Sequence, residues 1–421
     1  MIDLLIKNVN AGTPERQFDV AISQGVIREI GNELDYDAAE TIEGEGRLLI
    51  PGFVESHVHL DIALMNQGTA PGRREPYLSH YGLNDTLERR RQAFTSEDII
   101  KRSIAAIRLA VRHGVTAMRA QCHVDRTVGL KHLEALVRAR EACSRYMTLQ
   151  IVIFPQQGLT NHPDNVSLFR EALRNGADVM GAAANLDRGD NGNIDFRAHL
   201  DTALEIAVLE DVDLDAHVDL GLPSTVSSPD QLETVYLAQK VLECGYQNRV
   251  TAGHVSALDS AGPEVAAEAV NIIREAQLHV VSQPDLYRLG RDDKKGRRRG
   301  LTRVKELLKA GVNVTCASNN VRDALRPMGN FDLLEEGLLL AYGAHMDTLE
   351  ELDAIMKMIT ENPARMLGLK RYGVQPGNDA DLVVLDCRTP QEAIIGQSEK
   401  NWVIKKGRIL SKNECISELR W

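Results

Sequence analysis

Several features are scarce or missing in this sequence of 421 residues, and each absence narrows what the protein can be. The net charge is −11, so there is no excess of basic residues. Proteins that bind nucleic-acid phosphates usually carry a basic surface, and we therefore expect no nucleic-acid partner. The six cysteines form no CxxC pair, which argues against a zinc knuckle or a disulfide framework. No apolar run approaches the roughly 18 residues that cross a bilayer. We therefore expect no membrane contact and a cytoplasmic location.

The residues that are present describe an ordinary globular chain. Hydrophobic residues make up 43%, charged residues 26% and aromatic residues only 4%. Such a length allows one large domain or two to three smaller ones. We expect one large domain with an appendage.

The two ends of the chain have the texture of short β-strands. Candidate strands lie at residues 3–9, 19–31 and 40–53, and similar runs return at 372–386 and 400–413. We predict an antiparallel meander at each end. Together the two meanders form a small β-sandwich domain from residues 1–51 and 370–421.

Between these ends, apolar strand-like runs alternate with longer stretches of helical period. The runs are nearly continuous in apolar residues, as expected for strands that are buried on both faces. They cover residues 52–60, 114–124, 148–156, 176–185, 212–220, 249–256, 278–285 and 311–320. Helices are predicted at 96–113, 128–145, 229–245, 263–276 and 303–310. We predict a TIM-like (β/α)8 barrel over residues 52–369, with a doubly wound sheet as the alternative.

Histidines recur near the ends of the predicted barrel strands. His57 and His59 stand two positions apart in the first strand, so both side chains point to one face. His217 and His254 stand near the ends of later strands, where barrel enzymes place their active sites. A single buried histidine is more often a core group than a ligand, but four at corresponding positions predict a site for zinc or iron.

A metal held by histidines leaves coordination positions open, and a water bound there can become hydroxide near neutral pH. Such a water needs a base for its proton, and the leaving group needs an acid. The end of the last predicted strand is a natural place for that carboxylate. The sequence has Asn319 and Asn320 there instead.

Several motifs that run through nearly the whole chain carry a family likeness. They are PGFVESHVHLD, FPQQG, DAHVD, TAGHVS, GVNVTCASNNVRD, ENPARMLGL and YGVQPGNDADLVVLD. Together they resemble the amidohydrolase superfamily, and within it the cytosine deaminase branch. The resemblance implies metal ligands at His57, His59, His217 and Asn319. It also implies that His254 polarises the scissile centre or the attacking water.

The resemblance also indicates substrate-binding residues. Gln156 in FPQQG matches the glutamine that holds the substrate ring in cytosine deaminases. Arg119 lies where the family has an arginine, although the stretch around it is two residues longer than usual, and Asn320 completes the predicted substrate-binding set. Binuclear relatives carry a lysine on the fourth strand, and residues 176–185 contain none, so we predict one metal ion.

Two positions depart from the family pattern. Leu220 replaces the glutamate that cytosine deaminases have three positions after the third metal histidine, which argues against cytosine as the substrate. The nearby Asp219 either takes over a catalytic duty or fixes a backbone or ligand orientation. Asn319 replaces the aspartate that binds metal and serves as the base, and an amide cannot accept that proton at neutral pH. The change could be engineered, natural with His254 or Asp323 as the base, or a mark of lost catalysis.

We predict a metal-dependent hydrolase that cleaves a C–N bond of a small nitrogen heterocycle. The alternatives are a homologue that binds the ligand without turnover and a ring-opening cyclic amidohydrolase. We also expect a homo-oligomer. The charge run at 291–300 is interpreted as a solvated loop, with a flap or a subunit contact as the alternative.

Overall fold

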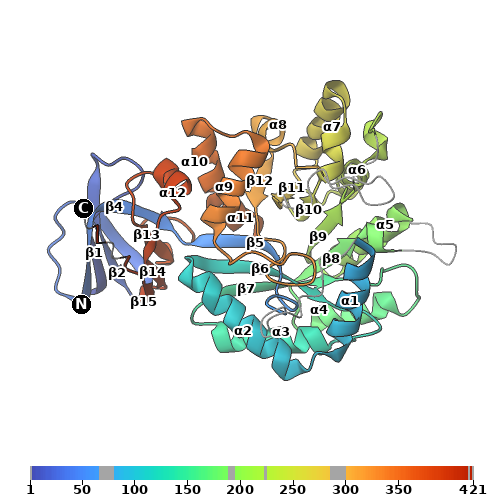
Figure 1. Ribbon diagram of the computed structural model, residues 1–421, viewed down its shortest axis with the longest axis horizontal. Helices are drawn as coiled ribbons and strands as arrows, with labels where there is room; N and C mark the ends of the chain where they lie inside the picture. The colour runs from blue at the N-terminus through green and yellow to red at the C-terminus, as the bar shows by residue number, and fades with distance from the viewer. Residues whose placement is uncertain are drawn as a thin grey trace.

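The structure is a computed structural model that describes residues 2–65, 80–187, 195–221, 225–284, 300–415 and 418–419. In the first helix, α1 (His80–Ala93), side chains are described from Leu87 onward. The charge run at 291–300 lies outside the described residues except for Gly300. Two parts are visible in Figure 1, a barrel and a sheet that contains both ends of the chain.

The larger part is a parallel barrel of eight strands that follow one another in sequence order. Its strands are β5 (Phe53–His59), β6 (Val115–His123), β7 (Thr148–Phe154), β8 (Val179–Ala183), β9 (Asp213–Val218), β10 (Val250–His254), β11 (His279–Ser282) and β12 (Asn313–Cys316). All eight predicted strands are confirmed. The barrel closes just beyond β12, where Asn319 forms a parallel bridge to Val58.

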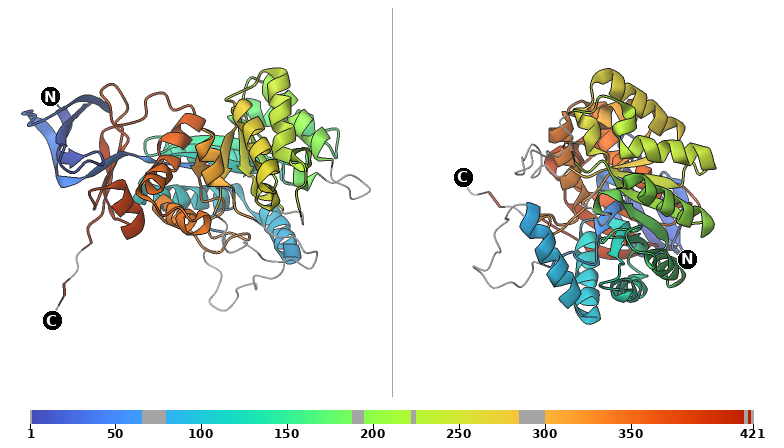
Figure 2. Two further views of the ribbon diagram at one scale, coloured as in Figure 1. Left: turned by 90° about the horizontal axis from the view of Figure 1, so that it is seen from above. Right: turned by 90° about the vertical axis from the view of Figure 1, so that its right-hand side faces the viewer.

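Helices surround the barrel, as Figure 2 shows from two further directions. They are α1, α2 (Ser96–Arg112), α3 (Lys131–Cys143), α4 (Asn165–Arg174), α5 (Phe196–Leu209), α6 (Glu233–Cys244), α7 (Pro263–Glu275), α8 (Val304–Lys309), α9 (Leu333–Ala344), α10 (Leu349–Met358) and α11 (Glu361–Met366). Short 3-10 turns occur at η1 (Ala184–Leu186), η2 (Pro229–Gln231) and η3 (Ser256–Ser260). The five predicted helices correspond to α2, α3, η2 with α6, α7 and α8. Among the described residues, no helix is long and apolar enough to span a membrane.

The smaller part is one sheet of seven strands in the order β15-β14-β13-β4-β1-β2-β3. Its strands are β1 (Ile2–Asn10), β2 (Gln17–Ser23), β3 (Val26–Gly31), β4 (Ala38–Pro51), β13 (Leu382–Leu385), β14 (Lys400–Lys405) and β15 (Arg408–Lys412). The prediction that both chain ends share one domain is confirmed. The predicted antiparallel meander is wrong in one respect, because β4 runs parallel to β1. A helix that was not predicted, α12 (Pro390–Gly396), separates β13 from β14.

The long strand β4 joins the two halves of this sheet. It pairs with β1 and, near its end, with β13, so it belongs to both halves. Apolar side chains from both halves, among them Leu4, Ile42 and Leu382, form one buried cluster, as the two layers of a sandwich do. The domain boundary near residue 51 stays a prediction, although β4 ends at Pro51 and β5 begins at Phe53.

Two buried lysines of the terminal sheet connect it to the barrel. Lys405 of β14 donates to the Thr116 carbonyl (3.0 Å), to Thr148 Oγ1 (2.9 Å) and to Asp381 (2.6 Å). Lys400 donates to Asp332 at the start of α9 (2.5 Å). Asp332 therefore joins the two parts of the molecule.

Candidate metal centre and active site

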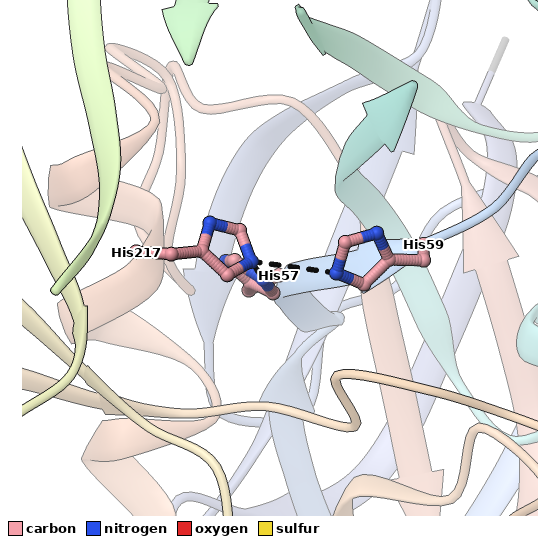
Figure 3. Close-up of side chains that lie close together, drawn as sticks. All are labelled: His57, His59 and His217. Carbon is pink, nitrogen blue, oxygen red and sulfur yellow. Dashed lines mark hydrogen bonds between the residues drawn. The ribbon is translucent and has the colours of Figure 1, made fainter. Parts of the chain in front are cut away.

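Three histidine rings meet inside the barrel at the carboxyl ends of its strands. His57 and His59 come from β5, and His217 comes from β9. Nε2 of His217 lies 3.1 Å from Nε2 of His57 and 3.3 Å from Nε2 of His59. Figure 3 shows the three rings turned toward one another. All three are buried, so the spacing of the HxH motif has placed both of its rings on the inner face, as predicted.

The electrostatics of His59 and His217 favour their neutral forms. Burial lowers the pKa of His59 well below its usual value, and the neighbouring His57 and His123 lower it further. Burial likewise lowers the pKa of His217 well below its usual value, with added effects from His57 and His59. A neutral imidazole is the form that binds a metal ion.

The arrangement fits a divalent cation. Three nitrogens at about 2 Å from one tetrahedral ion are separated from each other by about 3.3 Å, and the two observed Nε2 separations are close to this value. One cation satisfies all three lone pairs together, whereas hydrogen bonds among neutral imidazoles leave lone pairs facing one another. These residues can therefore hold one metal ion.

A buried polar group supports His57 from the side opposite Nε2. Asp215 Oδ1 lies 3.5 Å from His57 Nδ1, and Gln121 Nε2 donates to the same carboxylate oxygen (3.2 Å). Gln121 Nε2 also lies 3.3 Å from His57 Nδ1. A histidine that coordinates through Nε2 carries its proton on Nδ1 and needs an acceptor there, and the Asp215 carboxylate lies within reach of that atom. Burial alone would raise the pKa of Asp215, but the hydrogen bond and charge of His57 outweigh it and lower that pKa.

His254 adjoins the three rings at the end of β10. Its ring centroid lies 5.3 Å from that of His217 and 6.2 Å from that of His57. The structure thus brings together the four histidines that the sequence singled out. His254 is also buried, and its backbone has a φ of 72°, which is uncommon for a residue with a side chain.

Asn319 lies directly beside both histidines of β5. Its backbone N–H donates to the His57 carbonyl, and its carbonyl accepts from the His59 N–H, both at 2.9 Å. Its φ is 60°, in the left-handed region that asparagine and aspartate adopt more readily than most residues. The position at the barrel closure therefore fixes the backbone of Asn319 next to the candidate ligands.

The residues around Asn319 are held by their own network. Asn320 donates to Asp323 Oδ2 (2.7 Å), and Asp323 Oδ1 accepts from the backbone of Arg326 (2.9 Å). The Ser318 N–H donates to the buried Glu55. Asn320 and Asp323 are thus engaged with each other at the end of β12.

Asp219 was a candidate catalytic residue, and the structure shows what its carboxylate contacts. It accepts from the backbone N–H groups of Glu233 (2.8 Å) and Thr234 (3.2 Å) at the start of α6, and from the Thr234 hydroxyl (2.5 Å). In return, Glu233 accepts from the Asp219 N–H (2.7 Å). This pairing caps α6 and favours the alternative in which Asp219 fixes the backbone after His217.

Arg119, predicted to bind substrate, is not brought to the histidine rings. Its guanidinium donates to Gln150 (3.0 Å), to Asp213 (3.4 Å) and to the Met366 carbonyl (3.3 Å). Asp213 begins β9, so these contacts lie toward the amino-terminal end of the barrel, away from His217. We interpret Arg119 as a structural support.

Comparison with known proteins adds the family. The chain matches the model of the amidohydrolase family over residues 82–410. It is 32% identical over 422 residues to the N-isopropylammelide isopropyl amidohydrolase of Pseudomonas sp. (strain ADP), and the match covers 98% of both chains. The chain belongs to the amidohydrolase family.

Two further relatives of the present chain are deaminases. The chain is 28% identical to the pterin deaminase of Rhizobium rhizogenes, with 94% of this chain and 88% of the relative covered. The crystal structure of 5-methylcytosine deaminase from Klebsiella pneumoniae, liganded with phosphonocytosine, superposes with a TM-score of 0.88 at 27% identity and covers 99% of this chain and 100% of that one.

The chain also contains a buried hydrogen-bonded group, Asp61, His123 and His132, that could be predicted only in part from the sequence. Asp61 Oδ2 accepts from Nδ1 of His123 (2.8 Å), from Nδ1 of His132 (2.6 Å) and from the His123 N–H (3.0 Å). On its other side, His123 Nε2 lies 3.3 Å from Gln156 Oε1. These hydrogen bonds connect the loop after His59 to the predicted substrate-binding glutamine. His132 was missed because it stands in α3, outside any strand-end pattern.

Proposed function

We propose that this amidohydrolase is a metal-dependent hydrolase that cleaves a C–N bond of a small nitrogen heterocycle and releases ammonia or an amine. The observation that carries the proposal is the convergence of three buried imidazoles on one point, with His254 beside them. Membership of the amidohydrolase family supports the same conclusion.

His57, His59 and His217 would hold one divalent ion, zinc or iron. Asn319, whose backbone is bonded to those of His57 and His59, would add its amide oxygen. When bound, such an ion supplies Lewis acidity and an acidified water. No lysine stands on β8, which favours one ion over a bridged pair. Asp215 would accept the His57 Nδ1 proton and so favour the tautomer that offers Nε2 to the ion.

The remaining residues handle the substrate and its protons. His254 would donate to the electronegative atom at the scissile carbon or accept a proton there, which is the work of a general acid or base. Gln156, held by His123, would hydrogen-bond the ring. Asn320 and Asp219 would act through the backbone that they support, because their side chains already have partners.

The substrate class follows from the relatives and from one missing group. The relatives are named for N-isopropylammelide, pterin and 5-methylcytosine, which are all nitrogen heterocycles. Leu220 cannot shuttle a proton to a ring nitrogen, so we favour triazine-like or pterin-like rings over cytosine. A cytoplasmic location and a homo-oligomeric state remain predictions.

A screen of nitrogen heterocycles with the metal-loaded chain tests this proposal. It would include N-isopropylammelide, pterin and 5-methylcytosine, with free ammonia, free amine and ring-opened acid measured separately. We expect ammonia or amine from at least one ring, and loss of that product in His254→Ala with the metal retained. Ring-opened acid as the product would replace the proposal with a cyclic amidohydrolase.

A second function is favoured by Asn319 itself. Because an amide cannot take a proton from water at neutral pH, the chain would bind the heterocycle and turn it over slowly or not at all. Calorimetric binding of a ring by the chain, without product formation, would support this reading.

A further inference from the structure

The backbone at the end of β10 adopts a conformation that side chains disfavour. His254 has a φ of 72° and the next residue, Val255, a φ of 49°. Two successive residues with side chains in the left-handed region are rare, and a β-branched valine is especially unfavourable there. Such a conformation persists only where the surroundings hold it in place.

Both peptide groups of His254 are held by side chains from other segments. Its N–H donates to Gln283 Oε1 (2.8 Å), and its carbonyl accepts from the Thr302 hydroxyl (2.7 Å). Gln283 and Thr302 are 5% and 4% exposed, so both hydrogen bonds are shielded from water. The backbone of His254 is thus tied on both sides.

The segment that carries Thr302 is itself fixed to the turn that follows His254. Arg303 donates to the Leu258 carbonyl within η3 (3.0 Å) and to the Ala261 carbonyl just after it (2.6 Å). The Gly300 backbone approaches the same turn so closely that a Cβ there would lie 2.6 Å from the Asp259 side chain. The Thr302 hydroxyl is therefore a rigid anchor rather than a loose surface contact.

Gln283, which accepts from the His254 N–H, is anchored differently. It follows β11, and the edge of its side chain lies over Gly253, where a Cβ would be 3.5 Å from Gln283 Nε2 and 3.7 Å from His57 Cε1. Gln283 therefore reaches from β11 across β10 toward the group of histidines.

We propose that Gln283 and Thr302 are positioning residues that together hold the His254 ring at the reacting centre by fixing both sides of its strained backbone. This inference rests on the proposed function, in which His254 moves a proton at the substrate. If either hydrogen bond is lost, the backbone relaxes toward negative φ and the ring shifts. A displacement of about 1 Å at a catalytic group can cost about 100-fold in rate.

The test compares Thr302→Val, which removes the hydroxyl with little change in shape, with Thr302→Ser, which keeps it. We expect kcat on the best substrate of the screen to fall 10- to 100-fold in Thr302→Val and less than 3-fold in Thr302→Ser. Gln283→Leu should resemble Thr302→Val. The double variant should lose little more than either single variant, because both bonds hold one backbone. Metal content and melting temperature should stay near those of the parent.

Crystal structures of the same variants provide a readout that needs no turnover. We expect a positive φ at His254 in the parent and in Thr302→Ser, and a negative φ in the Gln283→Leu, Thr302→Val double variant. The inference would be overturned if His254 kept its backbone and ring position there, or if Thr302→Val and Thr302→Ser gave equal kcat. If the parent turned over no substrate, the proposed function would fail while the φ comparison still judged the inference.

Discussion

The ring atoms of three histidines decide what chemistry this site can support. His57, His59 and His217 present the same atom, Nε2, to one another from two strands. Burial keeps the pKa of His59 and His217 low, so these rings remain neutral bases at physiological pH. The neighbouring Asn319 carries an amide, which cannot accept a proton from water at neutral pH.

Replacement of this asparagine by aspartate would introduce a base at this position without disturbing the fold. Asn319→Asp should raise kcat on the substrates of the heterocycle screen by roughly 10²- to 10⁴-fold, because a positioned general base contributes about that much. Aspartate tolerates the left-handed φ of this position nearly as well as asparagine. The measurement is steady-state release of ammonia or amine at matched metal content.

The matched control is Asn319→Ala, which removes the amide and adds no base. It should show no gain, and it should melt earlier than the parent because alanine is disfavoured at this φ. Equal activity of the aspartate and alanine variants would show that the missing base is not what limits turnover.

Single residues differed in how well the sequence revealed them. His57 and His59 could be predicted because a spacing of two in a strand places both rings on one face, and His217 and His254 because they stand at strand ends. Asp215 and Gln121 could not be recognised, since each stands two positions before a histidine in an ordinary strand pattern. Gln283 and Thr302 act on a backbone, and no local pattern marks such contacts.

At the scale of elements, β9 and α6 form a unit around a pair of carboxyl groups. Burial raises the pKa of Glu233 to about 8, and the nearby Asp219 contributes to this rise. Because the pKa is higher in the folded than in the unfolded protein, the unfolded chain releases this proton first as pH rises. Glu233 therefore favours the folded state less and less between about pH 4.5 and pH 8.

Glu233→Gln should remove that pH dependence, because a glutamine can still accept from the Asp219 N–H and does not ionise. The free energy of unfolding, measured by urea titration between pH 5 and 8, should rise for the variant relative to the parent as pH increases. A parent and variant whose stabilities change in parallel over this range would refute the raised pKa of Glu233 as the cause of this pH dependence.

The strand β9 also carries Asp215, two residues before His217, which lies beside the candidate metal ligand His57. Asp215→Asn should weaken metal affinity about 10- to 100-fold, since the asparagine is a poorer acceptor for the His57 Nδ1 proton. Competition with a chelator measures this directly. Asp178→Asn is a suitable control, because Asp178 lies outside the histidine group and pairs with Arg140 (2.7 Å). Equal affinity of parent and Asp215→Asn would exclude this role.

The barrel strands could be predicted because both of their faces are buried, which produces long apolar runs bounded by turn residues. The pairing within the terminal sheet could not be predicted. The strands β1 and β4 pair in parallel, and β2 and β3 lie between them in the sequence, so no hairpin turn indicates their contact. The helix α12 was missed although local signals mark its start, because Thr389 caps it and Pro390 stands in its first turn.

At the scale of the whole molecule, the two parts are held together by buried cations of the terminal sheet. Lys405→Met would leave the partly buried Asp381 without its partner and should destabilise the protein by roughly 3–5 kcal/mol. The measurement is the free energy of unfolding from urea titration. The surface variant Lys412→Met should change it by less than about 0.5 kcal/mol, since its ion pair is exposed. Equal stabilities of the two variants would show that Lys405 does not secure this contact.

The metal content of the purified chain tests the central claim most directly. We expect about one zinc or iron per chain by plasma emission spectrometry after dialysis, and almost none in His57→Ala, His59→Ala or His217→Ala. His254→Ala should retain the metal, because that residue is proposed to act on the substrate. A parent chain that binds no divalent metal, or three single variants that each retain a full equivalent, would contradict the account.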